Sequence, residues 1–335
     1  MVNMKRTFDY APLSTSVSAR DMFLSLWRQT VETSKSSYTL MRIAVGVLVF
    51  ASLILVWLSM SGHISTLLLV GGMALAVLMG ALAQRDQIRL RRFAQANNLA
   101  YIESTEVLAR EGTIFNRGHS QRIVGGIRSE EPGFYEIANY RYTTGSGKNQ
   151  QLHKYGFVSI KLPRKLPHML LDSRKNNFMT AMTNLPELVK SGQALRLEGD
   201  FNEHFTLYVP AGYERDALYV LTPDIMQLLI DRAAGYDVEI VDDRLYLYVS
   251  GAFALTDATK LQQLFQLADT LYNDFYQQTD HYADARIGDR AANLVHADGA
   301  RLRHQSSLGL VMLIVGVVAV VWVLISVSYY VWNFW

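Results

Sequence analysis

The stretch IAVGVLVFASLILVWLSM (residues 43–60), the break Ser61-Gly62-His63 and the stretch ISTLLLVGGMALAVLMGALA (residues 64–83) contain no Asp, Glu, Lys or Arg. Each apolar arm is long enough to cross a hydrocarbon core of about 30 Å as a helix that rises about 1.5 Å per residue. The pattern predicts a transmembrane helical hairpin at residues 43–83, and the rest of the chain is interpreted from this hairpin.

A third apolar stretch, residues 308–327, leads into an aromatic C-terminus. Basic residues stand on the same side of all three stretches: Arg42 before the first, Arg85 after the second and Arg303 before the third. By the positive-inside rule, this charge pattern predicts three crossings of the inner (cytoplasmic) membrane, with the C-terminus outside.

Four segments follow from this topology. They are a basic N-terminal cytoplasmic arm (1–42), the transmembrane hairpin (43–83), a cytoplasmic α+β domain with helical linkers (84–306) and a C-terminal transmembrane helix (307–335). The lipid bilayer is therefore an expected partner. In the N-terminal arm, Ser18 is predicted to cap a short helix that runs to about Thr33.

The composition excludes several kinds of chemistry. The 335 residues include no cysteine, so disulfides, thiolate metal sites and cysteine nucleophiles are absent. A formal net charge of +2 gives no argument for nucleic-acid binding, and no nucleic-acid partner is expected.

Strand and helix patterns alternate within residues 84–306. Residues 121–127, 134–142 and 155–161 read as strands, with a hairpin loop at 143–151 and an irregular, proline-punctuated stretch after them. Thr222 and Pro223 are placed to begin a helix that Gly235 ends, and Thr256 is placed to begin a long helix. Further predictions are a strand pair at 236–241 and 245–249 and a linker helix at 280–305. Together they predict an α+β domain with a mixed or antiparallel sheet and packing helices.

Two runs within this domain carry a family resemblance. They are LEGDFNEHFTLYVPAGYERDALYVLTPDIMQLL (residues 197–229) and EIVDDRLYLYV (residues 239–249). They resemble a bacterial membrane-protein family known only as a domain of unknown function, number 3137. The resemblance implies a bacterial source and a membrane-anchored α+β domain. It supplies no activity and no catalytic residues.

Three groups of residues invite a chemical interpretation. The run from Thr144 to Lys148 looks like a phosphate loop, but Tyr142 and Asn149 stand where that motif needs Gly and Ser or Thr. Carboxylates near a strand end, Glu198, Asp200 and Glu203, are more simply turn residues. Asp280, His281 and Asp284, with His296 and Asp298, form a possible divalent-ion cluster that is more simply a solvated polar face. We therefore assign no catalytic, cofactor-binding or metal-binding residue and expect no cofactor.

These observations favour a membrane-anchored cytoplasmic interaction or scaffold domain of the bacterial envelope, bound to a partner protein or to further copies of itself. The alternative is a membrane-bound hydrolase that acts on a lipid or peptide through a site assembled from distant residues. Enzyme activity is left open, and a non-enzymatic role is favoured. A deep cleft with convergent carboxylates or histidines would support the hydrolase.

Overall fold

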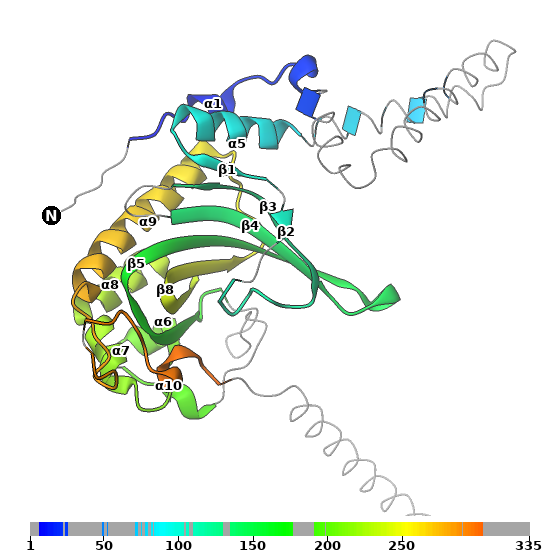
Figure 1. The fold of residues 1–335 in the computed structure, drawn as a ribbon. Coiled ribbons are helices and arrows are strands. Elements are labelled where there is room, and N and C mark those ends of the chain that lie inside the picture. Colours follow the sequence, from blue (N-terminus) through cyan, green and yellow to red (C-terminus); the bar gives the residue numbers. More distant parts are fainter. Residues whose placement is uncertain are drawn as a thin grey trace, which may run out of the picture.

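The computed structural model describes residues 7–22, 24–25, 84–103, 105–106, 110–129, 135–176, 191–197, 199–289 and 291–303, together with isolated positions between 49 and 82. These residues form an α+β fold in which helices cover one face of a strongly curved sheet (Figure 1).

The sheet contains eight strands within the described part of the chain, in the order β1-β3-β4-β5-β7-β6, with β2 beside β3 and β8 beside β5. Every strand pair is antiparallel. The strands are β1 Ala100–Ile102, β2 Thr105–Glu106, β3 His119–Arg128, β4 Tyr135–Thr144, β5 Gln151–Ser173, β6 Ala194–Leu195, β7 Phe205–Tyr208 and β8 Asp237–Ser250.

Strand β5 is the longest, with 23 residues, and it organises the sheet. Its first half pairs with β4, its last four residues pair with β7, and β8 runs along its other edge from Gly156 to Leu171. The register with β8 shifts between Lys161 and Leu166 and again between Leu166 and Met169. Pro163 and Pro167 lie at these bulges. Proline has no backbone N–H to donate, and at a bulge the regular ladder of hydrogen bonds is already interrupted. The irregular stretch predicted after residue 161 is therefore a bent continuation of the strand.

The predicted hairpin at 143–151 is confirmed. Thr144 pairs with Gln151, and the turn between them carries the short 3-10 helix η1 (Gly147–Asn149). Gly145 has φ +77°, and a Cβ there would lie 2.2 Å from the carbonyl oxygen of Asn149. Only glycine fits this turn without strain. The predicted strand pair at 236–241 and 245–249 is wrong, because both halves belong to the single strand β8.

The helices in the described residues are α1 Ala11–Ser14, α5 Arg85–Ala96, α6 Phe201–His204, α7 Glu214–Val220, α8 Pro223–Ala233, α9 Ala258–Thr279 and α10 Ala297–Ala300, with the 3-10 helix η2 at Ser191–Gln193. Helix α8 begins as predicted, because the Thr222 hydroxyl accepts a hydrogen bond from the amide of Ile225 and Pro223 follows. Helix α9 begins two residues later than Thr256, and Asp257 caps it. Ser18 accepts the amide of Asp21 as predicted for a cap, and the rest of that helix beyond residue 25 lies outside the described residues.

The larger core lies between the helices and the sheet (Figure 1). Helix α9 crosses the sheet diagonally, and the ring of its Phe265 packs against Phe93 of α5 and Tyr135 of β4. The long strands send alternate residues to this side, for example Val158 and Ile160 of β5 and Leu245 and Leu247 of β8. The period of two in the strands thus fixes which side chains meet the helices.

The opposite face of the sheet has its own smaller core. The residues that alternate with the first set point there, among them Tyr140, Phe157 and Tyr248. A loop, residues 110–118, covers them and inserts Ile114 and Phe115, which are 0% and 1% exposed. The ring of Phe115 lies 5.0 to 5.5 Å from the rings of Tyr140, Phe157 and Tyr246, so the loop fills an aromatic pocket.

The prediction of three membrane crossings, and with it the multi-pass location in the inner membrane, is not supported. No helix in the described residues is both long enough and apolar enough for a crossing. The longest, α9, has 22 residues and is amphipathic: its apolar residues, such as Leu264 and Leu271, are buried, whereas charged residues such as Asp274 lie off that face. The apolar stretches behind the prediction lie outside the described residues, 43–83 almost entirely and 308–327 entirely.

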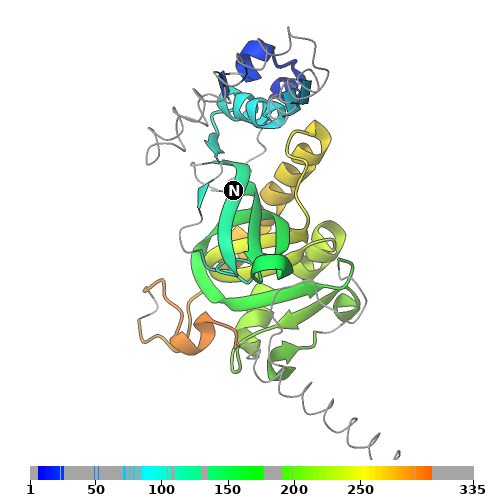
Figure 2. The same cartoon turned by 90° about the vertical axis from the view of Figure 1, so that its right-hand side faces the viewer.

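The predicted linker helix at 280–305 is also wrong. In the part of this stretch that the structure describes, residues 282–289 and 291–303 run as turns and extended chain with one short helix, α10. We call these residues the C-terminal strap. Figure 2, turned by 90°, shows the end of the strap and α10 beside the curved sheet, away from α9.

Candidate functional site

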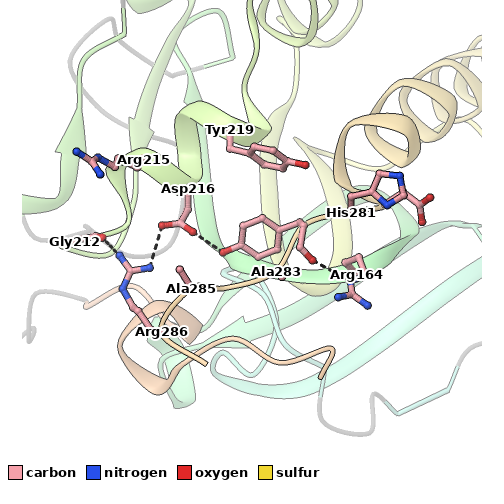
Figure 3. Close-up of a pocket in the computed structure, with 11 residues that line it drawn as sticks. Arg164, Gly212, Arg215, Asp216, Tyr219, His281, Ala283, Ala285 and Arg286 are labelled. Carbon is pink, nitrogen blue, oxygen red and sulfur yellow. Dashed lines mark hydrogen bonds and ion pairs between the residues drawn. The ribbon is translucent and has the colours of Figure 1, made fainter. Parts of the chain in front are cut away.

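A cleft of about 840 Å³ lies between α7, the turn that follows α9, and the bend of β5 (Figure 3). The residues that line it are Arg164, Gly212, Arg215, Asp216, Tyr219, Asp280, His281, Tyr282, Ala283, Ala285 and Arg286. The cleft thus joins a single short helix to two segments that lie far from it in the sequence.

Helix α7 supplies one wall because its sequence separates a buried face from an exposed one. Ala217 and Val220 are buried against the core, three residues apart on one face of the helix. Arg215, Leu218 and Tyr219 therefore point outward, and the last two are 53% and 43% exposed. This wall lies inside the run 197–229 that carries the family resemblance.

Tyr213, just before α7, anchors the strap under the cleft. Its side chain is 1% exposed, and its hydroxyl donates a 2.8 Å hydrogen bond to Asp284. Burial and this bond both raise the pKa of Tyr213. The strap also passes directly over the ring, since a Cβ on Gly299 would lie 2.2 Å from it.

Asp284 is a buried acceptor that collects four hydrogen bonds, one of them from the guanidinium of Arg286. Besides Tyr213, the backbone amides of His296 and Arg286 donate to its carboxylate at 2.9 Å. Burial raises the pKa of Asp284, but the hydrogen bonds from His296, Arg286 and Tyr213 outweigh it and hold the pKa below its usual value. The carboxylate therefore stays ionised and fixes the turn in the strap.

Arg286 ties the floor of the cleft together. Its guanidinium lies 3.7 Å above the ring of Tyr213 and forms ion pairs with Asp216 at 3.1 Å and Asp284 at 3.2 Å. It also donates to the carbonyl oxygen of Gly212. Burial lowers the pKa of Arg286, but the two carboxylates raise it by more, so the net pKa lies above its usual value. The side chain is therefore a permanent cation within this network.

Tyr282 and Arg164 complete the network around the cleft. The Tyr282 hydroxyl donates to Asp216 at 2.7 Å, and the Nε of Arg164 donates to the carbonyl oxygen of Tyr282 at 3.0 Å. Burial, followed by the bond to Asp216, raises the pKa of Tyr282. Figure 3 shows Arg215 and Asp216 on one side of the cleft and Arg164 on the other. We call the hydrogen-bonded and ion-paired residues Asp216, Tyr282 and Arg286 the frame of the cleft. The exposed residues Arg215 and Tyr219 form its rim.

The structure separates the residues that the sequence suggested for metal binding. Asp280 and His281 line the cleft, whereas Asp284 is buried against Tyr213. His296 contacts Asp298 on the exposed part of the strap. No group of three or more candidate metal ligands is present in the described part of the chain.

The other two sequence groups lie elsewhere. Thr144 to Lys148 forms the β4–β5 turn, and Asp200 and Glu203 are exposed around α6. Glu198 lies outside the described residues. None of the described residues of these two groups lines the cleft.

Sequence reasoning missed a polar cluster on the second face of the sheet. Glu239 of β8 is fully buried and accepts hydrogen bonds from the amide and hydroxyl of Thr113, from Tyr248 and from His168, at 2.7 to 2.8 Å. Burial raises its pKa, but the bonds from His168 and Thr113 outweigh burial and hold the pKa below its usual value. The available signal was a glutamate flanked by the apolar residues Val238 and Ile240.

The tautomer of His168 follows from its two partners. Its Nδ1 lies 3.0 Å from the backbone N–H of Leu302, which can only donate, so Nδ1 is the acceptor. The proton then sits on Nε2 and points at Glu239. The cluster thereby joins loop 110–118, β5, β8 and the strap, and its burial gives it a structural role.

Comparison of the chain with models of protein families, with curated proteins and with solved structures finds no match. The resemblance to the domain-of-unknown-function family remains a prediction, and the cleft is interpreted from its own geometry.

Proposed function

We propose that this domain is an interaction module that binds another protein through the cleft beside α7. The observation that carries the proposal is that exposed tyrosine and arginine side chains surround a cleft whose inner residues are fixed by ion pairs and hydrogen bonds. Tyr219 and Arg215 lie on the rim, while Arg286 is locked below them by two carboxylates and a carbonyl oxygen.

The chemistry of the rim supports this role. Tyrosine and arginine are the residue types enriched at the energetic centres of protein interfaces, because each offers a large contact area together with hydrogen-bonding groups. Leu218 adds exposed apolar surface next to Tyr219. A frame already fixed by ion pairs loses little conformational entropy when a partner binds.

The alternative function, hydrolysis of a lipid or peptide, needs a carboxylate or imidazole directed at a substrate. Asp280 and His281 line the cleft, but within the described residues no side-chain hydrogen bond or ion pair directs them at a substrate. Asp216 is the third such group, and both of its oxygens are occupied, one by Tyr282 and the other by Arg286. This arrangement makes Asp216 part of the frame. Binding is therefore the better supported of the two functions.

Site-specific photo-crosslinking tests the proposal. A benzoylphenylalanine at position 219 of the full-length chain, in its native host, is expected to capture a discrete protein that mass spectrometry identifies. The same group at Leu152, which is 54% exposed in strand β5 near the β4–β5 turn, serves as the control. A product of twice the mass of the chain identifies a second copy as the partner. Equal products at both positions, or none at 219, would contradict the proposal.

A further inference from the structure

We infer that the projecting end of the sheet docks on a bilayer surface that contains anionic lipids. Figure 1 shows β4 and β5 continuing past the helices to the turn that joins them. We call this end of the sheet the wing; it comprises residues 119–123 of β3, 139–144 of β4, 151–155 of β5 and the β4–β5 turn. None of these residues lines the cleft, so the wing is a second surface, independent of the proposed function.

Strand pairing places three cationic residues in one row across the wing. Arg122 of β3 is the partner of Arg141 of β4, and Arg141 is in turn the partner of Lys154 of β5. Residues directly opposite each other in antiparallel strands share a face, with Cβ atoms about 5 Å apart. Like charges in such positions repel each other, so the row favours a bound anion.

The three side chains are accessible and have no partners within the part of the chain that the structure describes. Arg122 and Lys154 are exposed, and Arg141 is half-buried. None of them forms a side-chain hydrogen bond or an ion pair with another described residue. From residue 137 to residue 160, the sequence adds Lys148 in the turn and contains no Asp or Glu. The wing therefore offers uncompensated positive charge.

Two carboxylates come close to the row in the chain or in the register, and they leave its charge positive. Glu106 of β2 is the register partner of Arg122, at the outer end of the row. Asp257 follows the loop in which Phe253 exchanges two hydrogen bonds with Asn139, and its carboxylate caps α9. Three cations thus stand against one carboxylate within the row itself.

An exposed leucine continues the same face and indicates which anion fits. Leu152 is the partner of Thr143 and lies two positions from Lys154, so it shares the face of the row, and it is 54% exposed. Tyr140 and Tyr142 point to the opposite face, into the smaller core. The open face therefore lacks the aromatic platform on which single-stranded nucleic acids stack. A bilayer surface offers phosphates to the cations and an apolar boundary to the leucine.

The test uses a dye at the tip of the wing in the full-length chain. Because the chain has no cysteine, Gln150→Cys provides a single site for the environment-sensitive dye nitrobenzoxadiazole. Vesicles of phosphatidylglycerol and phosphatidylcholine should raise its fluorescence, and added salt should reduce this signal. Vesicles of phosphatidylcholine alone should leave it unchanged. The dye reports the turn itself, so lipid contact elsewhere in the chain does not produce the signal.

Variants of the labelled protein test the two components of the surface. Lys154→Gln should raise the lipid concentration at half-maximal signal about fivefold, the effect of one cation near an anionic surface. Leu152→Ala should raise it several-fold, because less apolar surface enters the boundary. The matched control is Arg232→Gln, which removes an exposed arginine in the last turn of α8 and should have no effect.

Three outcomes would overturn the inference. They are equal signals with and without phosphatidylglycerol, equal effects of Lys154→Gln and Arg232→Gln, or no effect of Leu152→Ala. Tighter binding to a single-stranded DNA oligonucleotide than to the anionic vesicles, measured by the anisotropy of the same dye, would also overturn it in favour of a nucleic acid. The crosslink at position 219 reports a different surface, so neither experiment decides the other.

Discussion

Glu239 shows how one charged residue is accommodated in the interior of this protein. Its carboxylate is 0% exposed, yet four donors from Thr113, His168 and Tyr248 satisfy both oxygens. A buried charge is tolerated when hydrogen bonds replace the lost hydration. The two bonds from Thr113 fix the loop that carries Phe115, so Glu239 links the sheet to the loop that covers its second face.

The pH dependence of stability should report this carboxylate. The pKa of Glu239 in the folded protein lies below its usual value of 4.5, so the group stabilises the fold above that pH. The contribution is lost as the pH falls through the lower, folded value. We expect Glu239→Gln to lower the free energy of unfolding at pH 7 by about 1–3 kcal/mol. The loss of stability on acidification should also be shallower in the variant than in the wild type.

Urea unfolding from pH 7 to pH 3 measures both effects. Glu203→Gln, at an exposed position in α6, is the control and should follow the wild-type curve. Other carboxylates with lowered pKa values, such as Asp284, remain in every variant, so the difference between curves isolates Glu239. Parallel curves for wild type and Glu239→Gln would show that folding does not lower the pKa of this carboxylate.

At the scale of the element, α9 depends on the residue that begins it. The Asp257 carboxylate accepts the amides of Thr259 at 2.9 Å and Lys260 at 3.2 Å, which the first turn cannot satisfy internally. The helix packs along β5 and brings Phe265 and Leu271 into the larger core. A weakened start to α9 therefore affects the main contact between the helices and the sheet.

Asp257→Ala should destabilise the protein by about 1 kcal/mol, because the cap is lost while the packing is kept. Asp257→Ser retains an acceptor at the same place and should recover most of the loss. Thermal unfolding followed by circular dichroism distinguishes the three proteins. Equal melting temperatures for the alanine and serine variants would show that the cap contributes nothing.

At the scale of the whole molecule, the C-terminal strap is held by side chains from distant parts of the fold. Gln193 forms a reciprocal pair with Arg303, donating to its carbonyl at 2.7 Å and accepting its amide at 2.9 Å. His168 accepts the amide of Leu302, and Asn293 accepts the amide of Lys165. The strap owes its path to these bonds, since most of it has no regular secondary structure to satisfy its backbone.

Gln193→Ala should loosen the end of the strap without unfolding the sheet. Loss of the pair costs about 1 kcal/mol of local stability, so exchange of the Arg303 amide should accelerate several-fold while β5 amides keep their protection. Hydrogen exchange with mass spectrometry measures both. Gln227→Ala, an exposed residue on α8, is the control. Uniform acceleration across the sheet would mean that the strap and the sheet open as one unit.

Local signals in the sequence were sufficient for several elements. Thr222 and Pro223 begin α8, the loop predicted at 143–151 forms the β4–β5 turn, and the start predicted at Thr256 lies one residue from the cap of α9. Each of these features is decided by backbone geometry and side-chain periodicity within about one or two turns of chain. The prediction of membrane crossings rested on the length of the uncharged apolar stretches and on the basic residues that flank them, and it found no support in the described helices.

Tertiary contacts decided the rest. A bulged strand reads as irregular where Pro163 and Pro167 interrupt it, and only pairing with β8 shows that β5 continues. The cleft exists because Tyr213 meets Asp284, 71 residues away, and the strap lies where His168 meets Leu302, 134 residues away. Such contacts carry no local periodicity, because the chain between the partners can take many paths before the core forms. The sequence by itself therefore determined the separate elements, and only folding around β5 brought together the arginines and tyrosines of the candidate site.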